Sequence, residues 1–196
     1  MAEIVLASSS KRRSEILSAC GIAHRVHPSG SEEISGEAGD ITRIVIWNAE
    51  KKAEKVAGLF PCEIIIGADT LVVAGDNLIG KPSSEEEAKD ILRGFSGGSI
   101  EVHTGLCVID ASLGKKTLGS DISRVRVEKI GKHEVERLFS LLGPYDKAGG
   151  FSIEGVGSMI FDNIEGSYFN VLGLPMIKLR ELFAVIGLDI LDHVKI

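Results

Sequence analysis

The sequence predicts an α/β protein built on a mixed, twisted sheet with flanking helices. Strand-like and helix-like segments alternate along the chain in the order β-α-β-α-β-β-α-β-β-α-β-α, which is typical of this fold class. The chain of 196 residues is also long enough to bury a hydrophobic core without disulfides or metals. We therefore expect one domain that covers residues 1–196.

Seven segments are expected to form strands, because they are either continuously apolar or alternate between apolar and polar residues. They cover residues 3–7, 24–27, 63–73, 78–79, 100–110, 116–128 and 158–164. The apolar run at 63–73 indicates a strand covered on both faces, with an interruption at Gly67–Thr70. The turn residues that follow, 74–77, predict a hairpin to the next strand.

Five segments are expected to form helices, because their apolar residues recur with helical spacing. They cover residues 11–20, 41–59, 85–95, 133–142 and 176–186. Asp40 is a plausible N-cap of the second helix, and Ser83 or Ser84 of the third, which begins with three glutamates. Gly143-Pro144 and Gly187 follow the last two helices as stop signals.

The long helix expected at 41–59 is predicted to have one buried face and one solvent-exposed face. The expected buried residues are mainly apolar: Ile44, Trp47, Ala49, Ala53 and Val56. The three lysines Lys51, Lys52 and Lys55 would ordinarily face solvent.

Composition excludes several classes of protein. A net charge of -6 argues against a general affinity for nucleic-acid backbone. The three cysteines lie too far apart for common metal-binding spacings, and an odd number does not suggest a disulfide framework. The N-terminus lacks the pattern of a signal peptide, and no apolar run approaches the ~20 residues of a membrane span. We expect a cytoplasmic protein with no nucleic-acid or membrane partner.

The segment Leu6–Leu17 suggests a phosphate-binding loop. An apolar strand runs into serines, including Ser8 and Ser10, then into Arg12 and Arg13 at a helix start. Free backbone N–H groups and the helix dipole attract anions there, and arginine can grip phosphate oxygens. The alternative is an N-capped helix with a solvated basic first turn, although basic residues there oppose the dipole.

Two further motifs suggest charged groups aimed at a ligand. Asp69 follows a buried strand segment, where a carboxylate must be paired, hydrogen-bonded or bound to metal, unless it only caps a turn. Lys81 stands between Gly80 and Pro82, which hold it at a fixed place, and the alternative is a surface lysine in a connection. Glu33 lies in a polar loop at 28–40 that would ordinarily be solvated.

Other chemistries lack their motifs. Gly155-x-Gly157 lacks the third glycine of a dinucleotide fingerprint, and no GxxxxGK[ST] motif occurs. No pair of histidines has metal-ligand spacing, so carboxylates that suit Mg²⁺ or Mn²⁺ are the candidate metal ligands. Hydroxyls, cations and carboxylates together indicate phosphate chemistry with water as the nucleophile.

An ordered set of short motifs resembles the Maf family of nucleoside triphosphate pyrophosphatases. The motifs extend over nearly the whole chain: Leu6-Ala7-Ser8-x-Ser10-x-Arg12-Arg13, Ala49-x-x-Lys52-Ala53, Gly67-Ala68-Asp69-Thr70, Gly80-Lys81-Pro82, His103-Thr104-Gly105, Asp146-Lys147-Ala148-Gly149 and Gly166-Ser167-Tyr168-x-Asn170-Val171-x-Gly173-Leu174-Pro175. The resemblance implies a fold similar to inosine triphosphate pyrophosphatases, with two lobes around a cleft. It also implies cleavage of a nucleotide between its α and β phosphates, a divalent metal (Mg²⁺ or Mn²⁺) and a possible homodimer.

The resemblance also implies roles for individual residues. Asp69 matches the family's catalytic acid, and Asp69 with Glu33 would be the metal ligands. The residues that match phosphate-handling positions are Ser8, Ser10, Arg12, Arg13, Lys52 and Lys81.

Arg12, Thr70 and Glu154 match the positions that sort substrates within the family. The dTTP/UTP branch has Arg, Thr and Gln there, whereas the 7-methyl-GTP branch has Trp first and Glu last. This chain therefore resembles the dTTP/UTP branch at two positions and the other branch at Glu154. The alternatives are a pyrophosphatase for 7-methyl-GTP or other modified nucleotides, and a non-catalytic nucleotide-binding regulator of septum formation.

Overall fold

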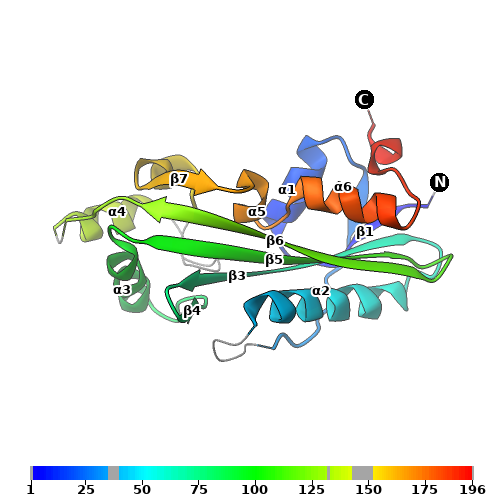
Figure 1. Ribbon diagram of the computed structural model, residues 1–196, viewed down its shortest axis with the longest axis horizontal. Helices are drawn as coiled ribbons and strands as arrows, with labels where there is room; N and C mark the ends of the chain where they lie inside the picture. Colours follow the sequence, from blue (N-terminus) through cyan, green and yellow to red (C-terminus); the bar gives the residue numbers. More distant parts are fainter. Residues whose placement is uncertain (1, 35–39, 132, 143–151, 196) are drawn as a thin grey trace. The chain divides into compact units, whose positions relative to one another are not determined.

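In the part of the chain that the structure describes, the fold consists of a seven-stranded mixed sheet and six α-helices (Figure 1). The computed structural model describes residues 2–34, 40–131, 133–142 and 152–195. The strands are β1 (Ile4–Leu6), β2 (His24–Val26), β3 (Ile64–Ala74), β4 (Asn77–Ile79), β5 (Ser99–Asp110), β6 (Lys115–Val127) and β7 (Phe161–Glu165). The helices are α1 (Lys11–Ala19), α2 (Ile41–Ala57), α3 (Glu85–Phe95), α4 (Glu134–Leu142), α5 (Tyr168–Val171) and α6 (Met176–Val185), with two short 3₁₀ helices at Gly155–Met159 and Ile190–His193.

The strand order is β2-β1-β3-β5-β6-β7, and β4 pairs with β3. β1 is parallel to both β2 and β3, whereas β4 is antiparallel to β3 and β7 is antiparallel to β6. The predicted α/β class with a mixed sheet is therefore confirmed.

The chain divides into two compact units, at points within β3, β5 and β6. The first unit contains residues 1–70, 104–121 and 172–196, and the second contains residues 71–103 and 122–171. The expected single domain and the cleft between lobes stay predictions.

One core cluster of the first unit forms where α2 packs on β1, β3 and β5. The small residues Ala49 and Ala53 of α2 are fully buried, so the helix can approach the strands closely. In Figure 1, α2 lies on one side of these strands, and α1 and α6 lie on the other.

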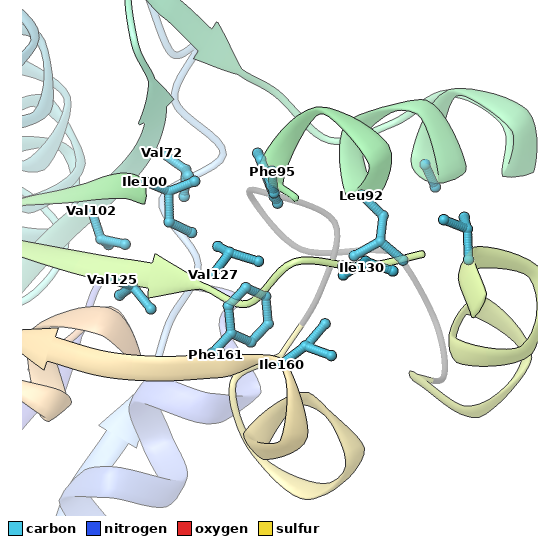
Figure 2. Packing of buried hydrophobic residues seen from close by; sticks show 12 residues of the cluster. Val72, Leu92, Phe95, Ile100, Val102, Val125, Val127, Ile130, Ile160 and Phe161 are labelled. Carbon is cyan, nitrogen blue, oxygen red and sulfur yellow. The ribbon is translucent and has the colours of Figure 1, made fainter. Parts of the chain in front are cut away.

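The second unit has its own core, built from α3, α4 and the distal parts of the long strands (Figure 2). Leu92 and Phe95 from α3 are buried there with strand residues such as Val102 and Val125. The core also includes Phe161 at the start of β7. Among the described residues, no helix is both long and apolar enough to cross a membrane.

Several local predictions are confirmed, and others are wrong. Asp40 caps α2 by accepting from the Arg43 backbone N–H at 3.2 Å, and Ser84 caps α3 in the same way. The strand expected at 158–164 begins only at Phe161, because the preceding residues form a 3₁₀ helix. The short helix α5 was not expected.

The predicted faces of α2 were partly wrong. Trp47 is 38% exposed, whereas Lys52, expected in solvent, is only 7% exposed. Lys52 is buried because two carboxylates partner its ammonium group, which apolar periodicity cannot reveal.

The expected interruption of the strand at Gly67–Thr70 is also wrong, because β3 runs through it. Gly67 is needed for packing rather than for a turn. A Cβ at this position would lie 2.2 Å from the carbonyl oxygen of Ala49 on α2.

Gly67→Ala is therefore expected to lower the free energy of unfolding by about 2 kcal/mol or more, because backbone atoms of α2 would have to shift. Gly94→Ala in α3 is the matched control: its Cβ would meet nothing within 4 Å, so better helix propensity should make it neutral or slightly stabilising. Urea denaturation of both variants measures the difference. Equal stabilities would contradict the tight contact between α2 and β3.

Candidate active site

The loop between β1 and α1 is organised by its own serines. Ser10 is the N-cap of α1, and its side chain accepts from the Arg13 backbone N–H at 3.5 Å. The buried Ser8 Oγ accepts from the Ser10 backbone N–H at 3.2 Å. These bonds confirm the N-cap of the helix, whereas the solvated basic first turn of the alternative is wrong for Arg13, which is buried. Phosphate binding by the loop stays a prediction.

Arg13 lies beneath this loop, with 8% of its surface exposed. Its Nε donates to the Gly173 carbonyl oxygen at 2.8 Å, and its Nη1 donates to Ser8 Oγ at 2.9 Å and to the Ala68 carbonyl oxygen at 3.0 Å. Its Nη2 donates to Thr70 Oγ1 at 2.8 Å. Acceptors among the described residues thus occupy four of the five guanidinium N–H groups. The guanidinium joins the β1–α1 loop, β3 and the segment before α6.

The burial of Arg13 has an electrostatic cost. Removal from water lowers the pKa of its guanidinium, while the negative charges of Asp69 and Glu33 oppose this change. The two carboxylates therefore help to keep a buried cation at this position.

Asp69 and Lys52 form a buried ion pair in the first unit. Asp69 is 4% exposed, and its Oδ1 lies 2.6 Å from Lys52 Nζ. The same ammonium nitrogen lies 2.7 Å from Oε1 of Glu33, whose side chain is largely exposed. Three residues predicted for the site thus come together: Asp69 from β3, Lys52 from α2 and Glu33 from the polar loop that precedes α2.

Asn48 completes this group, and the sequence analysis missed it. Its Nδ2 donates to Asp69 Oδ2 at 2.8 Å. Asn48 lies four residues before Lys52 on α2, and therefore on the same face of the helix. A polar residue one turn from a candidate site lysine is the signal that could have identified it.

Thr70 follows Asp69 in the sequence and belongs to the hydrogen-bond network of Arg13. Its Oγ1 accepts from Arg13 and lies 3.0 Å from Thr104 Oγ1. Arg12, one residue before Arg13, is half-buried on α1. A contact of Thr70 or Arg12 with a nucleotide base stays a prediction.

Lys81 and Glu154 belong to the second unit. Lys81 is exposed in the connection from β4 to α3. Glu154 is exposed before the first 3₁₀ helix, and its Oε1 accepts from the Tyr168 hydroxyl at 3.3 Å. The structure describes both residues within their own unit, so their place in a site with Asp69 stays a prediction. The motif at 146–149 lies outside the described residues.

The predicted metal ligands fit a divalent ion by their chemistry. Among the described residues, no three histidine, cysteine or acidic side chains cluster in a way that could hold a metal. Glu33 and Asp69 offer two carboxylates instead, and Mg²⁺ is commonly bound by one or two carboxylates together with substrate phosphates. Both carboxylates already have a positively charged partner, because Lys52 Nζ forms an ion pair with each of them.

Comparison with known proteins identifies the family of this chain. A family model described as Maf-like protein matches residues 3–186. The chain belongs to the Maf family.

Several curated Maf relatives match almost the whole chain. A dTTP/UTP pyrophosphatase of Desulforamulus reducens is 40% identical over 190 residues, which cover 97% of this chain and 100% of the relative. A dTTP/UTP pyrophosphatase of Pyrococcus furiosus is also 40% identical, over 93% of this chain and 94% of its own length. A third, from Dictyoglomus thermophilum, is 37% identical over 96% of this chain and 98% of its own length.

Proposed function

We propose that this Maf protein hydrolyses a nucleoside triphosphate, dTTP or UTP foremost, to the nucleoside monophosphate and pyrophosphate. The observation that supports this most strongly is the buried Asp69 carboxylate, held by Lys52 and Asn48 at a motif of this family. The curated relatives match almost the whole chain and carry the name dTTP/UTP pyrophosphatase.

The carboxylate of Asp69 has two possible roles in this reaction. It can orient or deprotonate the attacking water, or it can bind the metal. Its burial suits both roles, because a fixed carboxylate in a water-poor site interacts strongly with a nearby proton or cation.

The cations would stabilise the negative charge that develops on the phosphates. Lys52 is already held against Asp69, and Lys81 is a further phosphate-handling candidate because it stands in a motif that resembles one of the family. Ser8 and Ser10 of the β1–α1 loop would handle the phosphates together with Arg12 and Arg13 at the start of α1. The guanidinium of Arg13 places a positive charge next to this loop. Four of its five N–H groups donate to described residues.

Glu33 and Asp69 would hold Mg²⁺ or Mn²⁺ together with phosphate oxygens of the substrate. When bound, such an ion supplies a Lewis acid that polarises the phosphate and makes bound water more acidic. We also propose that the protein is cytoplasmic, that it can form a homodimer, and that its partner is the nucleotide rather than nucleic acid or membrane.

Glu154 is the residue that bears on base preference. A carboxylate only accepts hydrogen bonds, so it can pair with the N3–H of thymine or uracil but cannot donate to the adjacent carbonyl oxygen. It also suits a cationic 7-methylated guanine, which keeps a 7-methyl-GTP pyrophosphatase as the second candidate.

Glu154→Gln is expected to raise the ratio of kcat/KM for dTTP over 7-methyl-GTP by roughly tenfold, the equivalent of one charge-assisted hydrogen bond. The amide can accept and donate on the thymine edge at almost unchanged volume. Pyrophosphate release is measured with dTTP, UTP, CTP, GTP and 7-methyl-GTP. Glu165→Gln, also exposed in the second unit, is the control.

The same panel of nucleotides tests the proposed function. Wild-type preference for 7-methyl-GTP would overturn the pyrimidine assignment, and identical profiles for wild type and Glu154→Gln would remove Glu154 from the site. A protein that binds nucleotides without releasing pyrophosphate, with Mg²⁺ or Mn²⁺ present, would instead support the regulator of septum formation.

A further inference from the structure

Asn48 uses every hydrogen-bonding group of its side chain. It is 1% exposed. Its Oδ1 accepts from the Ile34 backbone N–H at 3.0 Å, and its Nδ2 donates to the Ile34 carbonyl oxygen at 3.1 Å as well as to Asp69 Oδ2. One side chain therefore contacts both the strand that carries Asp69 and the loop that carries Glu33.

The partners of Asn48 also determine which way its amide points. The Ile34 N–H can only donate, so it requires the amide oxygen. The Ile34 carbonyl and the Asp69 carboxylate accept, so they require the two N–H groups. No other orientation satisfies all three contacts, and a flipped amide would place its oxygen against the carboxylate.

Asn48 belongs to a polar stripe on α2, formed by Asn48, Lys52 and Lys55. These residues are spaced i, i+4 and i+7, so they lie on one face of the helix. Each one holds the early loop at a different point: Asn48 at Ile34, Lys52 at Glu33 and Lys55 at the Gly30 carbonyl oxygen, 2.9 Å away. The stripe attaches the described part of this loop to the helix.

We propose that Asn48 is a positioning residue that couples the Asp69 carboxylate to the loop bearing Glu33. Its Nδ2–H fixes Asp69 Oδ2, which leaves Oδ1 facing Lys52. Its two bonds to Ile34 hold the residue next to Glu33, so that both carboxylates meet the same ammonium group. The catalytic part of this inference rests on the proposed function.

The coupling has a physical consequence for turnover. A reacting carboxylate must be held to within a fraction of an ångström, and polar partners behind such groups affect metal binding or activity by about 10- to 100-fold when removed. Asn48→Leu keeps a similar volume but removes all three bonds. Asn48→Asp keeps an acceptor for the Ile34 N–H, but it removes both donors and places a second carboxylate against Asp69.

The kinetic test uses the nucleotide that the wild-type enzyme hydrolyses best. We expect Asn48→Leu to lower kcat by about 10- to 100-fold, with a much smaller change in KM. We expect Asn48→Asp to lower kcat at least as much. In an Asp69→Asn background, adding Asn48→Leu should lower kcat by less than about threefold, because residues that act through one another are not additive.

A second readout needs no turnover. Trp47 is the only tryptophan of the chain, and it lines a surface hollow of about 650 Å³ together with the loop residues Gly30, Ser31 and Glu32. Quenching of its fluorescence by acrylamide therefore reports on the attachment of the loop to α2. We expect greater quenching in Asn48→Leu than in wild type, and a smaller increase in Asn48→Asp. Arg43→Gln, exposed on the same helix, is the control and should match wild type.

Circular dichroism first establishes that each variant folds. If Asn48→Leu does not fold, Asn48→Asp is used for the kinetic test instead. Unchanged kcat in a folded Asn48 variant, a full multiplicative loss in the double variant, or wild-type quenching of Trp47 in Asn48→Leu would each overturn the inference. If the wild-type protein hydrolyses no nucleotide, the proposed function is wrong, and so is the catalytic part of this inference. Altered quenching of Trp47 in the Asn48 variants would still support the attachment of the loop by Asn48.

Discussion

Asp69→Asn is expected to lower kcat by about 10²-fold or more while leaving the fold intact. This is the usual scale for removing a general acid or base. The substitution keeps the size of the side chain but removes its charge and its ability to take up a proton. Loss of a metal-binding carboxylate would act in the same direction, so the prediction does not depend on which role Asp69 has.

The surroundings of Asp69 indicate why the fold should survive. Lys52 would keep its ion pair with Glu33, so the buried ammonium group would not be left without a partner. The amide of asparagine can present its oxygen to the Nδ2–H of Asn48, which keeps that hydrogen bond, but its NH₂ group then faces Lys52, so the bond to Lys52 is lost. The change therefore removes a charge from the site without leaving a cavity.

Pyrophosphate release and circular dichroism together check this prediction. Asp76→Asn is the matched control, because Asp76 is exposed in the turn between β3 and β4, and it should retain wild-type turnover. A folded Asp69→Asn protein with near wild-type turnover would show that the reaction does not need this carboxylate.

Local signals in the sequence were sufficient for most of the fold. The caps at Asp40 and Ser84 are decided by residues within one helical turn, so they could be predicted without knowledge of the rest of the chain. The prediction of an interruption in β3 is wrong because Gly67 is required for close packing against α2, which is distant in the sequence. The requirement that excludes a Cβ there comes from Ala49 on α2.

The polar interior was harder to predict for the same reason. Periodicity assigned Lys52 to solvent, because a lysine is buried only where partners from other elements neutralise it. Those partners, Glu33 and Asp69, lie 19 and 17 positions away in the sequence. Asn48 was missed because its role exists only once the loop and β3 are both in place.

The two neighbouring arginines show the same limit. Both Arg12 and Arg13 follow the serines of the β1–α1 loop, and the sequence does not tell which one turns inward. The structure buries Arg13 in a network of acceptors and leaves Arg12 half-buried. We therefore expect the two to differ sharply in their contribution to stability.

Arg13→Ala is expected to lower the free energy of unfolding by about 3 kcal/mol or more, besides weakening the handling of triphosphates without changing base preference. Truncation removes a donor from several buried acceptors, among them the carbonyl oxygens of Ala68 and Gly173. It also removes a buried cation that interacts favourably with the charge of Asp69.

Urea denaturation of two further variants separates the parts of this effect. Lys11→Ala removes an exposed cation from the same helix and should leave the free energy of unfolding near that of wild type. Arg13→Lys keeps the charge but has a single nitrogen, which cannot reach acceptors that the planar guanidinium contacts with three separate nitrogens. We expect it to recover only a minor part of the lost stability. Full recovery would mean that the positive charge alone stabilises this region, and the attachment of the segment at Gly173 to β3 through the guanidinium would then be unnecessary.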